Sequence, residues 1–123
     1  MNSNILIAED DRIIRDLISE VIRRRGSFPL AAHDGEEAFQ IFSNVRVDLI
    51  ITDLKMPRID GMTFIRMVRE KNCTIPIIII TGYGSDKNRK LAAHYGVFAV
   101  LSKPCSIAEI SETIEKTLNQ PSG

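Results

Sequence analysis

Short apolar runs alternate along the chain with longer amphipathic segments. Three of these runs are continuously apolar, which is typical of strands buried on both faces of a parallel sheet. One run is short and contains Pro29, so we place it at an edge of the sheet. The predicted strands are residues 5–8 (ILIA), 28–32 (FPLAA), 48–52 (DLIIT), 75–81 (IPIIIIT) and 98–102 (FAVLS).

Each apolar run is followed by a segment with helical periodicity. The first such segment, residues 12–26, stops at Gly26, and the second begins at Asp34 with Glu37 three residues later. A third follows Asp60-Gly61, a pair typical of a turn before a helix. The first helix is predicted to bury a stripe of Ile14, Leu17, Ile18 and Val21.

The two C-terminal helices differ in their apolar content. Residues 85–96 carry few apolar side chains in their first turns, so we expect this helix to be the least firmly packed. The last helix begins with Ser106 and Glu109 at the spacing of a capping box. Its predicted buried stripe is Ile107, Ile110, Ile114 and Leu118.

Five strand–helix units predict an α/β fold with helices on both faces of a five-stranded parallel sheet. Right-handed crossovers favour the flavodoxin-like, doubly wound strand order 2-1-3-4-5. In that order the first and third strands are neighbours, with the topological switch between them. Ligands bind such sheets beyond the carboxyl ends of the strands. We therefore expect a site built from residues that follow Ala8 and Thr52.

Composition narrows the class of protein. The 123 residues fit one domain, and 44% hydrophobic with 26% charged residues predicts a soluble globular chain. Lys plus Arg and Asp plus Glu both number 16, which gives no support for direct binding to nucleic acid or membranes. Cys73 and Cys105 lack metal-ligand spacing and are predicted to be reduced thiols. Without an apolar span or signal peptide, a cytoplasmic location is expected.

Charged and polar residues stand at the C-terminal ends of four of the predicted strands. The first strand is followed by Glu9 and Asp10, the third by Asp53 and the fifth by Lys103, while the fourth ends on Thr81. Three carboxylates and one ammonium leave two negative charges, which match a divalent cation. Oxygen ligands favour Mg²⁺, Mn²⁺ or Ca²⁺ over zinc. Because the protein offers too few ligands to enclose Ca²⁺, the site favours Mg²⁺, with Mn²⁺ as the second choice.

Not every polar residue near these strand ends is assigned to the site. Asp11 is interpreted as the cap of the first helix. Asp48 begins a strand and is expected to lie away from the site, as are His33 and His94. A carboxylate beside Mg²⁺, a hydroxyl and a lysine is suited to accepting a phosphoryl group.

Four segments, ILIAEDD, DLIITDLKMPRIDGM, IIIITGYG and LSKP, resemble the receiver domains of bacterial two-component response regulators in order and spacing. The resemblance covers nearly the whole chain, so we expect a receiver domain at residues 1–119 and a tail or the start of a linker at 120–123. It implies that Asp53 accepts a phosphoryl group from a phosphohistidine on a sensor kinase. It also implies that Asp10 and Asp53 bind Mg²⁺ directly.

The same resemblance assigns the other residues of the site. Glu9 would act on the metal largely through water, and the backbone carbonyl of Lys55 would add a ligand. Thr81 and Lys103 would contact the phosphoryl oxygens, and the Lys103–Pro104 bond is expected to be cis. The chain would then be a switch rather than an enzyme, limited to self-phosphorylation from a donor and slow self-dephosphorylation.

The implied partners are a sensor histidine kinase or phosphotransfer protein and a downstream effector domain or protein. Direct contact with nucleic acid or membranes is not expected, and a phosphorylation-dependent homodimer is left open. The surface that would change on phosphorylation is formed by the fourth helix, the fifth strand and the last helix. It includes Lys87, Lys90, Val100 and Glu109.

Three positions depart from the family pattern. Val100 replaces an aromatic residue that commonly swings inward on phosphorylation, Cys105 replaces an often aromatic residue, and Glu9 replaces the commoner aspartate. Val100 therefore supports an alternative, a receiver-like interaction module that works without phosphorylation. A phosphohydrolase is disfavoured because Lys55 stands where a second acid would be needed. A flavin-binding protein is disfavoured because the end of the first strand is acidic.

Overall fold

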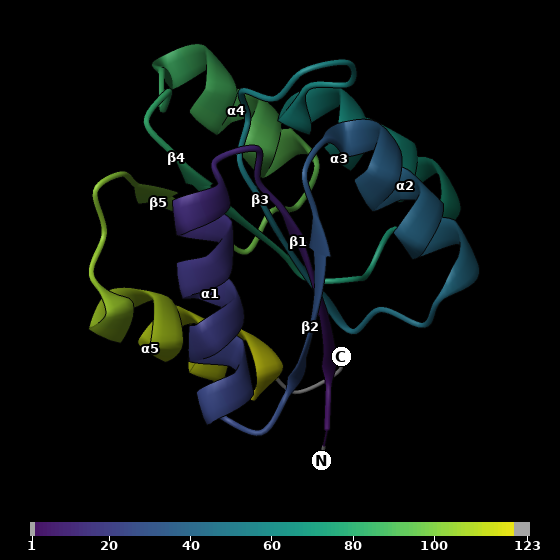
Figure 1. Cartoon of the computed structure of the whole chain (residues 1–123). Coiled ribbons are helices and arrows are strands. Elements are labelled where there is room, and N and C mark those ends of the chain that lie inside the picture. Colours follow the sequence, from purple (N-terminus) through teal and green to yellow (C-terminus); the bar gives the residue numbers. More distant parts are fainter. Residues whose placement is uncertain (1, 120–123) are drawn as a thin grey trace.

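The computed structural model describes residues 2–119 as five parallel strands and five helices (Figure 1). The predicted tail or linker at 120–123 lies outside the described residues. The strand order is β2-β1-β3-β4-β5, which confirms the predicted topology and the edge position of β2. The strands are β1 (Asn4–Ala8), β2 (Phe28–Ala32), β3 (Leu49–Thr52), β4 (Ile77–Thr81) and β5 (Ala99–Ser102).

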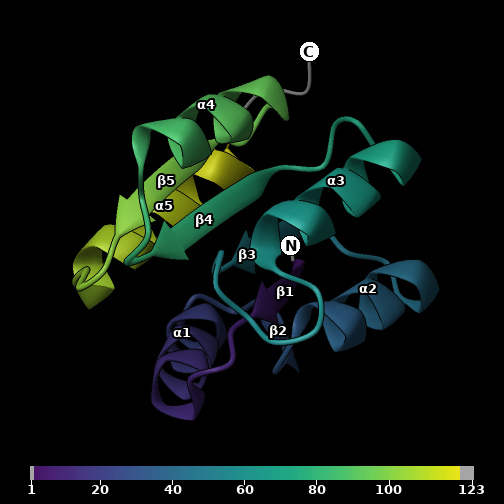
Figure 2. The same cartoon turned by 90° about the horizontal axis from the view of Figure 1, so that it is seen from above.

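The helices form a layer on each face of the sheet, as Figure 2 shows from above. One face is covered by α1 and α5, and the other by α2, α3 and α4. The two layers bury the sheet completely at its centre, so its strands need no polar face. The helices are α1 (Arg12–Arg24), α2 (Gly35–Asn44), α3 (Gly61–Lys71), α4 (Asp86–His94) and α5 (Ile107–Leu118).

The central strands bury both of their faces. In β1, Ile5 and Ile7 pack toward α1 and α5, while Leu6 and Ala8 pack toward α2, α3 and α4. All four are essentially inaccessible to solvent. Each buried isoleucine or leucine contributes about 2 kcal/mol by leaving water. The continuous apolar runs in the sequence follow from this two-sided burial.

The buried face of α1 is rotated relative to the prediction. Ile18, Val21 and Ile22 are buried, whereas Leu17 is 38% exposed. At 100° per residue, Leu17 lies about 90° around the helix from the centre of the buried face. Ile22, which the predicted stripe omitted, lies closer to that centre. The prediction of Leu17 as a core residue was therefore wrong.

The stripe predicted for α5 is also corrected at one end. Ile110, Ile114 and Thr117 are buried, but Ile107 is 50% exposed. The buried face is centred on these three positions, and Ile107, the first residue of the helix, lies to one side of it. Ser106 does cap the helix, because its hydroxyl accepts a hydrogen bond from the Glu109 N–H at 3.0 Å.

The fourth helix has few buried side chains, as its composition predicted. Ala92 is its single buried residue. Its C-terminal end is held by Arg69 of α3, which donates hydrogen bonds to the carbonyls of Tyr95 (2.6 Å) and Gly96 (3.3 Å). Burial lowers the pKa of Arg69. The same guanidinium donates to the Ile75 carbonyl at 2.8 Å, so it ties the end of α4 to the segment that precedes β4.

Polar side chains cap the other helices as well. Asp11 accepts from the Ile13 N–H at 2.9 Å, Asp34 from the Glu37 N–H at 2.7 Å and Asp60 from the Thr63 N–H at 2.8 Å. These bonds confirm the helix starts that the sequence predicted at Asp11 and Asp34. Within residues 2–119, no helix combines the length and the apolar character that crossing a membrane would require.

Candidate metal and phosphoryl site

The carboxyl ends of the strands meet at one edge of the sheet. The register pairs Ala8 of β1 with Thr52 of β3, so Glu9 and Asp53 follow at neighbouring positions. Thr81 at the end of β4 pairs with Ser102 of β5, directly before Lys103. The sheet thus brings together residues that are far apart in the sequence, at the topological switch where the strand order predicted a site.

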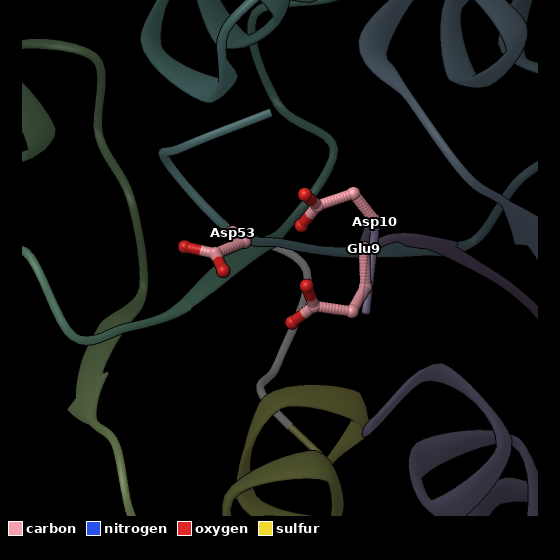
Figure 3. A group of neighbouring side chains, drawn as sticks. All are labelled: Glu9, Asp10 and Asp53. Carbon is pink, nitrogen blue, oxygen red and sulfur yellow. The ribbon is translucent and has the colours of Figure 1, made fainter. Parts of the chain in front are cut away.

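Three carboxylates gather at this edge. Glu9, Asp10 and Asp53 each offer an oxygen within 4.8 Å of the others, and Figure 3 shows their side chains around one space. Glu9 is 2% exposed and Asp53 is 6% exposed, whereas Asp10 is open to solvent. A donor set made only of oxygen atoms, partly open to water, fits Mg²⁺ or Mn²⁺ and not zinc.

Both carboxylate oxygens of Asp53 are held in place. Oδ1 accepts hydrogen bonds from the backbone N–H groups of Leu54 (2.6 Å) and Lys55 (3.4 Å). Oδ2 accepts a hydrogen bond from Lys103 Nζ at 2.6 Å. The start of α3 presses on the same segment, because a Cβ atom at Gly61 would lie 1.9 Å from the Asp53 carbonyl oxygen. Only glycine fits at that position.

Lys103 bridges two of the carboxylates. Its Nζ lies 2.6 Å from Glu9 Oε1 and 2.6 Å from Asp53 Oδ2. Burial on its own would lower the pKa of Lys103, but hydrogen bonds to Asp53 and Glu9 outweigh burial and raise it. The lysine is therefore charged and neutralises part of the acidic cluster. The Lys103–Pro104 bond that follows is cis, as expected.

Glu9 is the most deeply buried acid of the cluster. Burial raises its pKa, and hydrogen bonds from Lys103 and from the Asp11 N–H oppose that shift without cancelling it. Its Oε2 accepts from the Asp11 N–H at 3.2 Å, and its own N–H donates to the Ala32 carbonyl at 3.1 Å. These contacts fix Glu9 at the floor of the site.

Thr81 lies buried at the end of β4, and its hydroxyl oxygen accepts a hydrogen bond from the Tyr83 N–H at 3.1 Å. Among residues 2–119 it forms no hydrogen bond with Asp53. The loop that follows Thr81 meets the loop that follows Asp53, because Lys55 Nζ lies 3.2 Å from the Tyr83 hydroxyl and 4.8 Å from the centre of its ring. The two loops border a cavity of about 400 Å³ lined by Leu54, Lys55, Met56, Asp60, Met62, Tyr83 and Asn88.

Sequence reasoning missed the side-chain contact of Lys55, although it had noted the backbone carbonyl of this residue. The signal available was position, since Lys55 and Tyr83 each stand two residues beyond a site residue. The His33 ring contacts Glu37 at 2.7 Å and Asp34 at 3.3 Å, so the histidine is part of a polar cluster at the start of α2.

The other residues singled out in the sequence lie apart from the carboxylates. Val100 of β5 is partly buried against the core beneath α2, α3 and α4. Lys87, Lys90 and Glu109 are exposed on α4 and α5. Cys73 and Cys105 are both free thiols, and burial raises the pKa of Cys105.

Comparison with known proteins defines the class to which this fold and site belong. The family model for the response regulator receiver domain matches residues 5–115, and the chain belongs to that family. It is similar to sporulation initiation phosphotransferase F of Bacillus subtilis, with 32% identity over 96% of this chain and 95% of that protein. A receiver domain structure from Clostridium thermocellum matches with a TM-score of 0.87 and 31% identity, covering 95% of this chain and 94% of that one.

Other relatives are longer than this chain. The uncharacterised transcriptional regulatory protein YcbL of Bacillus subtilis is 27% identical over 94% of this chain, which spans 50% of that protein. The receiver fold is thus found both in proteins of about this length and as part of larger regulators.

Proposed function

We propose that this chain is a phosphoacceptor signalling switch. Asp53 accepts a phosphoryl group from a phosphohistidine of a sensor histidine kinase or phosphotransfer protein. A carboxylate oxygen of Asp53 attacks phosphorus, the new O–P bond forms, and the N–P bond breaks as imidazole leaves with its electron pair. The observation that carries the proposal is the position of the Asp53 carboxylate, 2.6 Å from Lys103 Nζ and beside Glu9 and Asp10.

The surrounding residues take complementary roles. The N–H groups of Leu54 and Lys55 orient the Asp53 carboxylate. Lys103 carries the positive charge that stabilises the phosphoryl oxygens, and Thr81 supplies a hydroxyl hydrogen bond. Mg²⁺, held by Asp10, Asp53 and the Lys55 carbonyl with Glu9 acting through water, would neutralise charge on the transferring group.

Phosphorylation would then change the surface formed by α4, β5 and α5. The new phosphoryl oxygens attract Lys103, which moves away from Glu9. They also attract the Thr81 hydroxyl, which moves toward Asp53, and the loop that contains Gly82 and Gly84 moves with it. Because α4 buries only Ala92, it is the helix that shifts most readily. A downstream effector domain or protein reads this surface, and a phosphorylation-dependent homodimer would form on it.

Two findings support phosphotransfer. The Bacillus subtilis relative that matches along nearly its whole length is named a phosphotransferase. The residues at the site also lack a second acid two positions beyond Asp53, where Lys55 stands, which disfavours a hydrolase. Slow self-dephosphorylation is the only turnover expected.

A second candidate function is a receiver-like interaction module that works without phosphorylation. It is favoured by Val100, whose side chain lacks the bulk of an aromatic residue that could swing into a space vacated by Thr81. This candidate predicts that partner binding is equally tight with and without Mg²⁺ and a phosphoryl donor. The phosphoacceptor switch predicts a change in affinity on phosphorylation.

The decisive experiment is to incubate the protein with acetyl phosphate and Mg²⁺ and detect the adduct by mass spectrometry. We expect an adduct that hydroxylamine removes, as an acyl phosphate requires. Asp53→Asn should abolish it, and Asp86→Asn, at an exposed carboxylate in the first turn of α4, should leave it unchanged. An absent adduct on the wild type, or an undiminished one on Asp53→Asn, would refute the proposal.

A further inference from the structure

Arg15 contacts the turn that carries the metal-site acids. It lies partly buried on α1, and its Nη1 donates hydrogen bonds to the backbone carbonyls of Glu9 (2.9 Å) and Asp10 (3.4 Å). No acidic side chain within residues 2–119 forms an ion pair with it. The guanidinium is therefore committed to the backbone of the two acids rather than to a carboxylate.

The turn from β1 to α1 needs such support because it carries three consecutive acids. Glu9 is held through its side chain by Lys103 and the Asp11 N–H, and Asp11 caps α1. The Asp10 carboxylate accepts no hydrogen bond from any residue between 2 and 119. The direction of the Asp10 side chain is consequently set by its backbone, and Arg15 is the side chain that binds the carbonyl of that residue.

We propose that Arg15 is a positioning residue for the metal site. By holding the carbonyls of Glu9 and Asp10, it fixes the turn so that the Asp10 carboxylate faces Asp53. This inference rests on the proposed function, because it assumes that the acids bind Mg²⁺. Groups that orient metal ligands without touching the metal typically contribute 10–100-fold to affinity.

The direction in which Mg²⁺ affinity changes when Arg15 is replaced distinguishes a positioning role from a purely electrostatic one. A guanidinium near a dication repels it, so loss of the charge alone would tighten Mg²⁺ binding. Loss of a positioning contact would weaken binding, because Asp10 would spend less time facing Asp53. The two explanations for Arg15 therefore predict opposite changes in affinity.

The chain offers a matched control on the same helix. Arg12, three residues earlier, has an 84% exposed side chain, and its Nε lies 3.7 Å from Asp16 rather than at the acidic turn. Arg12→Met and Arg15→Met remove the same charge from the same helix. Only Arg15→Met removes hydrogen bonds to the turn that carries Glu9 and Asp10.

The experiment measures the Mg²⁺ dissociation constant by calorimetry and the Mg²⁺ concentration that half-saturates Asp53 phosphorylation by acetyl phosphate. We expect Arg15→Met to weaken Mg²⁺ binding by about tenfold. Its phosphorylation rate at saturating Mg²⁺ should stay near that of the wild type, because the acceptor carboxylate is unchanged. Arg12→Met should bind Mg²⁺ as tightly as the wild type, or slightly more tightly.

A further variant keeps the test informative if Arg15→Met does not fold. Arg15→Lys keeps the charge, but its ammonium is one bond shorter and reaches the two carbonyls less well, so an intermediate affinity is expected. The inference is overturned when Arg15→Met binds Mg²⁺ as tightly as Arg12→Met, or when it lowers only the maximal rate. If Arg15→Met does not fold, wild-type Mg²⁺ affinity in Arg15→Lys overturns it. A wild type that binds no Mg²⁺ refutes the proposed metal site itself, and the role of Arg15 with it.

Discussion

Lys103 and Asp53, separated by 50 residues in the sequence, are joined by a 2.6 Å contact between Nζ and Oδ2. The same ammonium contacts Glu9, so one cation serves two buried acids while Asp10 stays outside the contact. Lys103 thus neutralises part of the negative charge of the cluster. It stabilises the carboxylates and, by charge repulsion, would oppose the binding of a divalent ion beside them.

Replacement of Lys103 by methionine tests this double role. Glu9 and Asp53 would be left as buried carboxylates without their partner, and we expect a loss of roughly 3 kcal/mol in the free energy of unfolding. Mg²⁺ should raise the Tm of Lys103→Met more than that of the wild type, because the competing ammonium is gone. Lys116→Met, at an exposed ion pair with Glu112, should change neither quantity. Equal Mg²⁺ responses in Lys103→Met and the wild type would contradict this role.

Asp10→Asn should change stability in opposite directions with and without the metal. Without Mg²⁺, the variant should be slightly more stable, because a charge facing Glu9 and Asp53 is removed. With Mg²⁺ at about a hundred times its dissociation constant, the wild type should gain about 2.7 kcal/mol, and Asp10→Asn should gain much less. Thermal melts across a Mg²⁺ titration measure both effects, with Asp16→Asn as an exposed control on α1.

Arg58 adopts a backbone conformation that favours glycine, with φ at 70°. Its guanidinium contacts Asp34 (3.4 Å) and Glu36 (3.6 Å), which links the loop after Asp53 to the start of α2. Arg58→Ala loses the ion pairs and keeps the unfavourable φ, whereas Arg58→Gly loses the ion pairs and relieves it. We expect Arg58→Gly to be more stable than Arg58→Ala by about 1 kcal/mol.

The control for Arg58 is Arg66, an exposed residue within α3. In a helix interior the order reverses, and Arg66→Ala should be more stable than Arg66→Gly by about 1 kcal/mol. Chemical denaturation of the four variants gives both differences. The same order at both positions would show that the loop relaxes and that Arg58 is not strained.

Glu115 of α5 links to Arg25, which follows α1, through a 2.8 Å ion pair. The hydrogen bond from Arg25, with a second from Asn119, lowers the pKa of Glu115. A depressed carboxyl pKa stabilises the folded state above the ordinary pKa of glutamate, and that contribution is lost as pH falls through the folded-state pKa. Glu115→Gln should therefore be less stable than the wild type near neutral pH and equally stable once Glu115 is protonated.

The control for this pH dependence is Glu112→Gln, because among residues 2–119 Glu112 forms only an exposed ion pair with Lys116 of α5. Thermal melts at a series of pH values should show a smaller difference for Glu112→Gln throughout. A Glu115→Gln difference that persists at acidic pH would mean that the amide disturbs packing instead of removing a charge.

Periodicity carried most of the fold prediction. Continuous apolar runs are diagnostic where both faces of a strand are buried, so β1, β3 and β4 were predicted closely. The helix faces were less exact, since Ile22 lies within the buried face of α1 and was omitted, whereas Leu17 lies beside that face and was included. Which of them is covered depends on where α1 rests against the sheet, a tertiary property that no local pattern contains.

The acidic residues of the site could be predicted from the sequence, but the arginine contacts that hold the neighbouring loops could not. Glu9, Asp10 and Asp53 stand out in the sequence because acidic residues directly after buried strands repel one another unless a positive charge lies nearby. Arg15 contacts backbone carbonyls of the acidic turn, and Arg58 combines a positive φ with ion pairs to the start of α2; neither arrangement has a signature in residue type or spacing. Their roles emerge only when the path of each loop is known.

The anchoring of α4 by Arg69 has a mechanical consequence. Hydrogen bonds to Tyr95 and Gly96 fix the far end of the helix, while its near end adjoins the loop after Thr81. If phosphorylation of Asp53 shifts α4 as proposed, we expect the displacement to be greatest near Ser85 and to decrease toward His94. The affinity of a partner that binds the first turn of α4 would then depend on whether Asp53 is phosphorylated. The affinity of a partner that binds the last turn would not.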